Sequence, residues 1–412
     1  MNLVIVCHYF YPEIGAPSAR IMETAMAWVE EGHDVTVVTC FPNHPTGVIP
    51  EQYRGLWFKE EEVSGIRVLR NYVYATLNEG FVKKTLGHVS FMFSSVLFSL
   101  GRLRKPDVLI VSSPTYFSVF SAYFMSLIKR VPFVFEVRDL WPEAIVKLGV
   151  LKNKGIIGIL EFFEMYFYRR AARVVVVTKS FKENLAARGV NPRKIEVITN
   201  GVDDRFFVLP DRKDLEELKG KLGLENKFVV LYVGAHGISH ALEKIIDAAK
   251  LIRNNRDICF LFVGEGAEKK KIVGLVDELG LDNVKFLPGQ PKEMMTRIYG
   301  LADVCLVPLR KLELFKEFIP SKMFEIMACG KPIIASLEGE AADILEEAES
   351  ALVVGPEDSE EIANAVRKLY NDDELRNRLA GKGRKFVQEH YTRNGLARRY
   401  LDILKSLPKG KR

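Results

Sequence analysis

Cysteine is scarce in this chain, and no two cysteines are spaced as a metal-binding or redox pair. The five are scattered, and four of them lie in or beside apolar runs: Cys7, Cys40, Cys259, Cys305 and Cys329. Zinc sites and the disulfide frameworks of small secreted domains both require recurrent, closely spaced cysteines. The sequence therefore favours a reducing compartment and predicts no zinc site.

Long apolar runs are missing as well. No stretch approaches the ~20 consecutive apolar residues of a membrane-spanning helix. The N-terminus, MNLVIVCHYF, lacks the basic region of a signal peptide and leads directly into an expected strand at residues 3–7. No repeat of solenoid period is present. We expect a cytoplasmic protein, and 412 residues suggest two domains.

The glycines of a dinucleotide-binding loop are also lacking. The first 39 residues follow a strand–loop–helix–strand pattern. A dinucleotide fold places three glycines in that first loop, whereas this loop has only Gly15. A nicotinamide-dependent dehydrogenase is therefore excluded. Gly15 either lets the backbone approach a phosphate or is needed only for the turn.

Strand-length apolar runs recur along the rest of the chain, with helical patterns between them. A charged linker containing Pro210, at residues 205–227, separates two such series. We predict an α/β fold with two doubly wound, Rossmann-like domains facing across a cleft. They would span residues 1–204 and 205–390, and a C-terminal helix and basic tail, 391–412, would pack back on the first domain. Ligands of such sheets bind at the carboxyl ends of the strands.

The stretch EFIPSKMFEIMACG, residues 317–330, predicts a loop followed by a short helix. Ser321 is a suitable N-cap, and Gly330 ends the helix. Lys322 places a positive charge in the first helical turn, where the helix dipole disfavours it unless an anion is bound. Glu325 lies one turn further on and could accept hydrogen bonds from sugar hydroxyls. The alternative is a solvated lysine beside an ordinary helix glutamate.

The chain resembles the GT4 retaining glycosyltransferases over essentially its whole length. Residues 317–325 fit their E-x7-E pattern, and FVGEG (262–266), NVKFLPG (283–289) and ADVCLVP (302–308) follow in the family's order. HYFYPEIGAPSAR near the start, RDLWPE (138–143) and YVGAHGISHALE (232–243) are similar to the group that includes fucosamine transferases of O-antigen synthesis.

This resemblance implies a GT-B fold and transfer of a sugar from a nucleotide donor, with UDP as the family-level expectation, and with retention at the anomeric carbon. Glu325 would bind the nucleotide ribose and Glu317 the donor sugar. Gly15 would lie against the diphosphate, and Asp139 near the sugar. The donor-binding set is completed by residues of three loops: Gly234, His236, Gly237, Gly264, Glu265 and Ser321.

Two departures from the family pattern affect the phosphate contacts and the residue before Asp139. The loop GAHGISH, residues 234–240, lacks the arginine and lysine that many members place there, so His236 and Lys322 would substitute. Arg138 stands where many members have a histidine. With Glu317 and Asp139, Lys322 would form the catalytic set. Donors at a helix N-terminus and a lysine can stabilise a leaving diphosphate without a metal.

No DxD motif lies at a strand end. Asp203-Asp204 falls in the linker and Asp372-Asp373 at a helix start, where both pairs are expected to be solvated or capping. We therefore expect no metal and no cofactor, with the nucleotide-sugar as substrate.

Positive charge is concentrated in the first half. Residues 80–173 hold 14 lysines and arginines against 6 acidic residues. Two aromatic helices with basic ends are expected there, at 83–104 and 154–172. Apolar faces bracketed by basic residues are typical of interfacial helices. We predict a peripheral association with the anionic inner face of the cell membrane and a saccharide or polyprenyl-linked acceptor, and no nucleic-acid partner. Alternatively, both helices simply pack on the sheet.

Two other functions remain open at this stage. A nucleotide-sugar epimerase on the same fold would need no acceptor surface, which the basic aromatic segment disfavours. A catalytically silent glycan-binding subunit would have no need of both Glu317 and Glu325. His8 and His44, after the first two strands, are expected to be structural or acceptor-binding residues.

Overall fold

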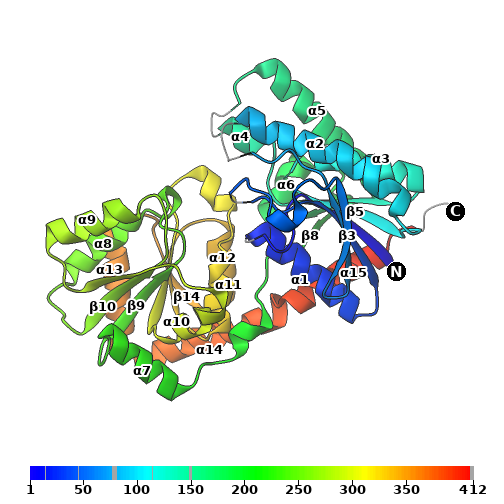
Figure 1. The fold of residues 1–412 in the computed structure, drawn as a ribbon. Coiled ribbons are helices and arrows are strands. Elements are labelled where there is room, and N and C mark those ends of the chain that lie inside the picture. Colours follow the sequence, from blue (N-terminus) through cyan, green and yellow to red (C-terminus); the bar gives the residue numbers. More distant parts are fainter. Residues whose placement is uncertain (14, 45, 77–80, 114, 148–150, 409–412) are drawn as a thin grey trace. The chain divides into compact units, whose positions relative to one another are not determined.

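The computed structural model describes residues 1–13, 15–44, 46–76, 81–113, 115–147 and 151–408. The chain forms two compact units (Figure 1), each described here by itself. Unit 1 comprises Met1–Thr199 together with the C-terminal segment from Asn394, and unit 2 comprises Asn200–Arg393. The basic tail after residue 408 lies outside the described residues.

Unit 1 is built on an eight-stranded sheet in the order β3-β4-β2-β1-β5-β6-β7-β8. Every neighbouring pair is parallel except β3 and β4. Its strands are β1 (Asn2–Val6), β2 (Asp34–Cys40), β3 (Phe58–Val63), β4 (Ile66–Asn71), β5 (Val108–Ser112), β6 (Phe133–Val137), β7 (Arg173–Val176) and β8 (Ile195–Val197). The central strands are continuous apolar runs because helices bury both faces of a parallel sheet.

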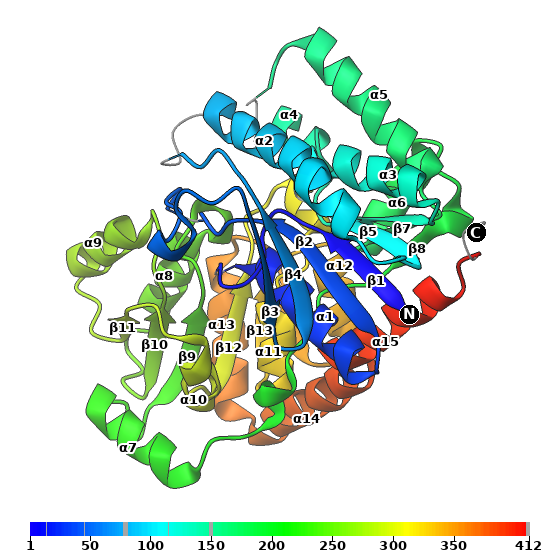
Figure 2. The same cartoon turned by 45° about the vertical axis from the view of Figure 1, so that its right-hand side comes forward.

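Helices cover the two faces of this sheet in separate layers, which Figures 1 and 2 show from two directions. One core joins the sheet to α2, α3, α5 and α6, and the other joins it to α1 and α15. The bounds are α1 (Ala16–Glu30), α2 (Phe81–Ser99), α3 (Ser118–Lys129), α4 (Glu143–Lys147), α5 (Lys154–Arg170), α6 (Lys179–Ala187) and α15 (Arg393–Lys405). The indole of Trp28 on α1 donates to the carbonyl of Ala397 at 2.9 Å, which ties α15 to this unit.

Unit 2 has an all-parallel, six-stranded sheet in the order β11-β10-β9-β12-β13-β14. Its strands are β9 (Phe228–Val233), β10 (Ile258–Val263), β11 (Val284–Leu287), β12 (Val304–Pro308), β13 (Ile333–Ser336) and β14 (Ala351–Val354). Its helices are α7 (Arg212–Leu222), α8 (Leu242–Leu251), α9 (Lys269–Leu279), α10 (Met295–Gly300), α11 (Lys322–Ala328), α12 (Glu340–Glu347), α13 (Ser359–Asn371) and α14 (Asp373–His390).

The strand order of unit 2 corresponds to 3-2-1-4-5-6 of a doubly wound dinucleotide-binding fold. The order reverses between β9 and β12, and ligands of such sheets bind beyond the carboxyl ends of the strands at that point. The loops that follow β9 and β12 contain residues 234–241 and 309–321. The predicted α/β class with two parallel-sheet units is confirmed. These two loops are therefore where a ligand of unit 2 is expected.

Two elements differ from the sequence-based expectation. The supposed linker 205–227 contains α7, with the Asp211 side chain accepting from the Lys213 N–H at 2.7 Å and Gly223 ending the helix at φ +60°. Strand β3 was not expected because its sequence, FKEEEV, is highly charged. It lies at the sheet edge, where one side of the strand meets water and charged residues deter further pairing.

None of the helices within the described ranges is both long enough and apolar enough to span a bilayer.

Candidate active site

Two loops of unit 2 are held together where β9 and β10 end. The His236 N–H donates to the carbonyl of Glu265 at 2.9 Å, and the Gly234 N–H to that of Val263 at 3.0 Å. A Cβ on Gly264 would stand 1.9 Å from the Gly234 carbonyl oxygen. Such a contact is impossible, so glycine is required at position 264 by this close approach.

Lys322, the first residue of α11, extends its side chain under this loop. Its Nζ lies 4.3 Å from the centre of the Tyr232 ring, and a Cβ on Gly234 would stand only 2.7 Å from it. Gly234, at φ +141°, thus leaves room for the ammonium group. Tyr232 is itself fixed, because its hydroxyl donates to the Ala235 carbonyl at 2.7 Å.

The Lys322 ammonium is buried, and no hydrogen-bond partner for it lies among the described residues. Burial lowers the pKa of Lys322 to about 7, and the Glu325 carboxylate opposes that shift only in part. A buried cation without partners is costly. The cation–π contact with Tyr232 offsets a small part of this cost. An anion beside Nζ would offset this cost.

Two histidines lie beside this lysine, both on the loop after β9. His236 is fully buried, and within the described chain neither of its ring nitrogens has a hydrogen-bond partner. Burial lowers the pKa of His236, and Lys269 and Lys322 lower it further. The His240 Nδ1 lies 3.2 Å from the Pro308 carbonyl oxygen, and burial lowers the pKa of His240 to about 4. Both imidazoles are neutral at pH 7 and can act as hydrogen-bond donors.

Glu325 lies one turn after Lys322 on α11. Its Oε2 accepts a hydrogen bond from the Tyr299 hydroxyl at 2.9 Å. Burial raises the pKa of Glu325, while the bond from Tyr299 and the positive charge of Arg393 lower it. The carboxylate is thus oriented by one partner, and its second oxygen can accept from a ligand.

Glu317 and Ser321 lie on the segment between β12 and α11. Glu317 ends a short 3-10 helix, Glu313–Glu317, and is half-buried. Glycine is required at 339 because a Cβ there would stand 2.2 Å from the Lys316 carbonyl oxygen. This contact fixes the backbone beside Glu317. The expected capping by Ser321 is wrong: Ser321 already has helical φ and ψ, and its side chain makes no capping bond.

Glu265 and Gly237 are the remaining residues of these loops that were predicted to bind the donor; Glu265 is exposed and Gly237 is half-buried. The Glu265 carboxylate accepts from Lys269 Nζ at 2.7 Å and from the Gly289 N–H at 3.4 Å, which links the loops after β10 and β11. Among the described residues, no atom lies within 4 Å of a Cβ built on Gly237, so packing does not require glycine there.

Gly15 and Asp139 belong to unit 1. Gly15 is the N-cap of α1 and is exposed; the nearest atom to a Cβ built on it is Pro17 Cδ at 3.7 Å. Asp139 follows β6. Although the residue is exposed, neighbouring protein atoms raise the pKa of Asp139, and the Arg138 guanidinium partly offsets this.

Sequence reasoning missed Tyr232, Tyr299 and His240 as members of this site. Tyr299 could not be recognised because it is an aromatic residue at a helical position of the core, 26 residues before Glu325. In unit 1, sequence reasoning did not identify His88 as a neighbour of His8. The His88 ring lies 4.7 Å, centroid to centroid, from that of His8, which is buried and whose pKa is lowered well below its usual range by burial.

Comparison with known proteins gives a consistent result for both units. The sequence profile of the family described as "Glycosyl transferases group 1" matches residues 214–386. That of the "Glycosyl transferase 4-like domain" matches residues 15–201.

Individual relatives and structures agree with these profiles. WcaI of Escherichia coli (strain K12), named for colanic acid biosynthesis, is 26% identical over 89% of this chain and 92% of its own length. The alpha-D-kanosaminyltransferase of Streptomyces kanamyceticus is 26% identical over 64% of this chain and 67% of its own. The crystal structure of Anabaena HepE in complex with UDP and glucose superposes with a TM-score of 0.73 and 18% identity, over 99% of this chain and 100% of that one.

Proposed function

Because this chain belongs to the GT4 family of glycosyltransferases with the GT-B fold, we propose that it transfers a sugar from a UDP-sugar, with retention, to a saccharide acceptor carried on a lipid. The observation that carries the proposal is the buried ammonium of Lys322, beside Glu325 at the strand-order reversal of unit 2, for which the described part of the chain offers no hydrogen-bond partner. HepE, which shares the fold, binds UDP and glucose.

The donor diphosphate is assigned to the space beside Lys322. A phosphate oxygen there would supply the missing partner of Nζ, and the neutral ring of His236 could donate a further hydrogen bond. Gly234 and Gly264 keep Cβ atoms out of this space. Charge on the diphosphate grows as the glycosidic bond breaks, so a fixed cation favours the transition state over the ground state.

The sugar and the ribose are assigned to the two glutamates. Glu325, oriented by Tyr299, would accept hydrogen bonds from the ribose diol. Glu317, held on the loop fixed by Gly339, would contact the donor sugar. Gly15 and Asp139 of unit 1 are proposed to approach the diphosphate and the sugar, and Gly237, Glu265 and Ser321 complete the proposed donor contacts.

Transfer is expected to need no divalent metal. The cation that meets the diphosphate in this proposal is Lys322, and the sequence has no DxD at a strand end. Treatment with EDTA should therefore leave the initial rate of UDP release within about twofold, because stabilisation by a preorganised lysine does not depend on metal. Loss of activity with EDTA, restored by magnesium or manganese, would contradict this account of the leaving group.

A membrane-facing surface is proposed on the outer side of α2, α3 and α5, which lie in one layer over the unit 1 sheet (Figure 2). Helix α3 joins the other two: it packs against α2, and its Phe120 ring lies 5.2 Å from that of Phe163 on α5. Several large apolar side chains of this layer are exposed, and they are named here as the apolar patch: Leu86, Phe93, Leu97, Phe124, Leu127, Ile128, Ile156, Ile159, Phe162 and Phe163.

The structure separates core from surface on these helices. Phe91, Phe167 and Tyr168 are buried and pack on the sheet, whereas Phe93 and Phe162 are 67% and 66% exposed. Exposed basic residues flank the apolar patch: Lys83, Lys84, Arg102, Arg104, Lys105, Arg169 and Arg170. Exposed apolar side chains beside basic ones are the composition of a surface that inserts among anionic lipid headgroups.

The wild-type protein is expected to float with anionic liposomes at low salt and to be released as salt increases. Each basic residue near such a membrane contributes about 1 kcal/mol. Changing Lys83, Lys84, Arg104 and Lys105 to glutamate should therefore abolish flotation while the protein stays folded by circular dichroism. A matched variant with four charge reversals on unit 2, at Arg212, Lys213, Lys219 and Lys221 of α7, should float normally. A wild-type protein that remains unbound at low salt would point instead to an acceptor free in solution.

A further inference from the structure

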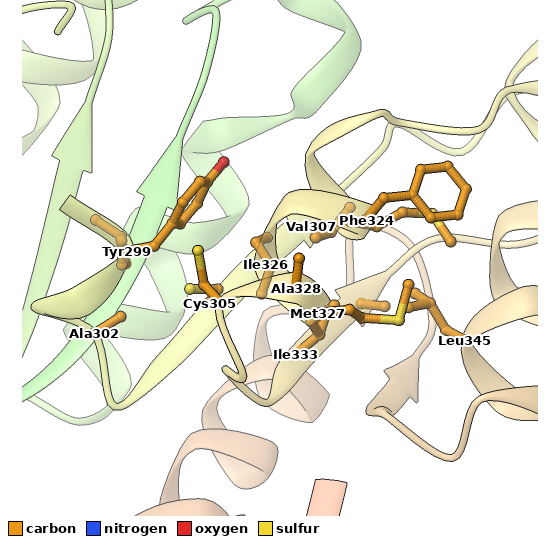
Figure 3. Packing of buried hydrophobic residues seen from close by; sticks show 14 of the residues in the cluster. Tyr299, Ala302, Cys305, Val307, Phe324, Ile326, Met327, Ala328, Ile333 and Leu345 are labelled. Atoms are coloured by element: carbon orange, nitrogen blue, oxygen red, sulfur yellow. The ribbon is translucent and has the colours of Figure 1, made fainter. Parts of the chain in front are cut away.

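Tyr299 lies where the apolar core of unit 2 meets the proposed ribose site. It belongs to the short helix α10, and its ring is 1% exposed. Figure 3 shows the ring beside Cys305, with the hydroxyl oxygen on the side away from Ala302. That hydroxyl donates to Glu325 Oε2 at 2.9 Å. The hydroxyl of this buried ring is thus hydrogen-bonded to a carboxylate of α11.

Burial and the neighbouring charge keep the Tyr299 hydroxyl protonated, so that it is the hydrogen-bond donor of this pair. Burial raises the pKa of Tyr299 well above its usual value, and the Glu325 carboxylate raises it further. The phenol is therefore protonated at neutral pH, and its hydroxyl donates to the carboxylate. For Glu325, burial raises the pKa, and the hydrogen bond from Tyr299 is the first of the influences that lower it, followed by Arg393, Lys292 and Lys322.

A carboxylate that binds a vicinal diol must present its oxygens in a fixed direction. The terminal torsion of a glutamate side chain is broad, so an unrestrained carboxylate loses entropy when a ligand orients it. The Tyr299 hydroxyl engages Oε2 and leaves Oε1 and the remaining lone pairs available. The tyrosine ring is held in place by packing against Cys305 and its neighbours. Its hydroxyl can therefore hold the carboxylate in one orientation.

We propose that Tyr299 is a positioning residue for ribose recognition: it fixes the Glu325 carboxylate so that the protein distinguishes a ribonucleotide from a 2′-deoxyribonucleotide. This inference rests on the proposed function, in which Glu325 binds the ribose of the donor. Tyr299 itself does not touch the nucleotide in this arrangement.

The test compares UDP with 2′-deoxy-UDP by calorimetry, in wild type, Tyr299→Phe and Glu325→Ala. Phenylalanine keeps the ring and removes only the hydroxyl. We expect Tyr299→Phe to lower the affinity for UDP by roughly threefold to tenfold, the scale of one hydrogen bond, and the affinity for 2′-deoxy-UDP by less. The preference for UDP should therefore shrink toward that of Glu325→Ala.

A pH series provides a readout that loss of packing would not change. The carboxylate accepts from the diol only when ionised, so affinity falls as the pH drops through the pKa of Glu325. Because Tyr299 lowers that pKa, Tyr299→Phe should move the acidic fall in affinity to higher pH.

Tyr370→Phe is the matched control, since the Tyr370 hydroxyl donates to the Asp257 carboxylate at 3.1 Å elsewhere in unit 2. It should change neither the preference nor the pH profile. If Glu325→Ala loses UDP affinity while Tyr299→Phe keeps the wild-type preference and profile, the positioning role is overturned and the ribose assignment stands. If Glu325→Ala binds UDP as wild type does, the ribose assignment itself fails, and the role of Tyr299 fails with it.

Discussion

Replacing Glu325 by alanine should lower the affinity for UDP by tenfold or more, measured by calorimetry. Hydrogen bonds to a charged group contribute roughly 1.5–3 kcal/mol each, and a ribose diol offers two. Burial raises the pKa of this carboxyl above its usual value, so it becomes protonated at a higher pH than an exposed glutamate would. The loss of affinity should therefore shrink as the pH is lowered, because the wild-type carboxylate then loses its charge as well.

Stability has to be followed in the same experiment because the alanine leaves the buried Tyr299 hydroxyl without its acceptor. Glu325→Gln keeps an oxygen for that hydroxyl, while it removes the charge and replaces the other oxygen by an amide NH2. It should therefore fold as wild type does and still bind UDP weakly. Glu360→Ala, an exposed glutamate on α13, should have no effect on binding. Equal affinity for UDP in wild type and Glu325→Ala would remove the ribose assignment.

The parallel sheets were predictable because strands buried on both faces are continuous apolar runs. DVCLVP, residues 303–308, contains β12, and VVVVT, residues 174–178, overlaps β7. Strand β3 was not predictable from such a run, because its charged side chains belong to an edge. Its Glu61 pairs with Arg70, which is buried on the neighbouring strand β4. That pairing depends on tertiary structure and is invisible to local periodicity.

Sequence patterns pointed to some residues of the candidate site but not to their geometry. The E-x7-E spacing singled out Glu317 and Glu325, and the misplaced charge singled out Lys322. The sequence did not indicate that Lys322 is buried under Gly234, because that contact joins segments almost 90 residues apart. The Tyr299 contact was hidden for the same reason. Local patterns identify residue types, whereas burial and partners are set by how distant loops pack.

Replacing Lys322 by methionine should stabilise the unliganded protein and impair the enzyme. Methionine fills similar space without a buried ammonium. The pKa of Lys322 is lowered from 10.5 to about 7, so the unfolded chain holds a proton that the folded chain releases between these pH values. The cost to folding is fully present below pH 7 and disappears as the pH rises toward 10.5. It corresponds to at most roughly 5 kcal/mol, and loss of the contact with Tyr232 reduces the gain.

Thermal melts from pH 6 to pH 10 should show this dependence directly. The melting temperature of Lys322→Met should exceed that of wild type most at pH 6–7, and the difference should shrink as the pH rises. In the same variant turnover should fall about a hundredfold, the scale of losing one preorganised group that stabilises a developing negative charge.

Lys331→Met is the matched control for both measurements. Lys331 is another lysine whose pKa is lowered by burial, but its Nζ donates to the carbonyls of Gly300 and Ala302 at 3.1 and 2.7 Å. Its replacement should lower the melting temperature and leave turnover unchanged, because that charge already has protein partners. Two results would contradict the proposal that this ammonium binds an anionic donor. One is a Lys322→Met protein that is less stable than wild type at pH 7, and the other is one that turns over at the wild-type rate.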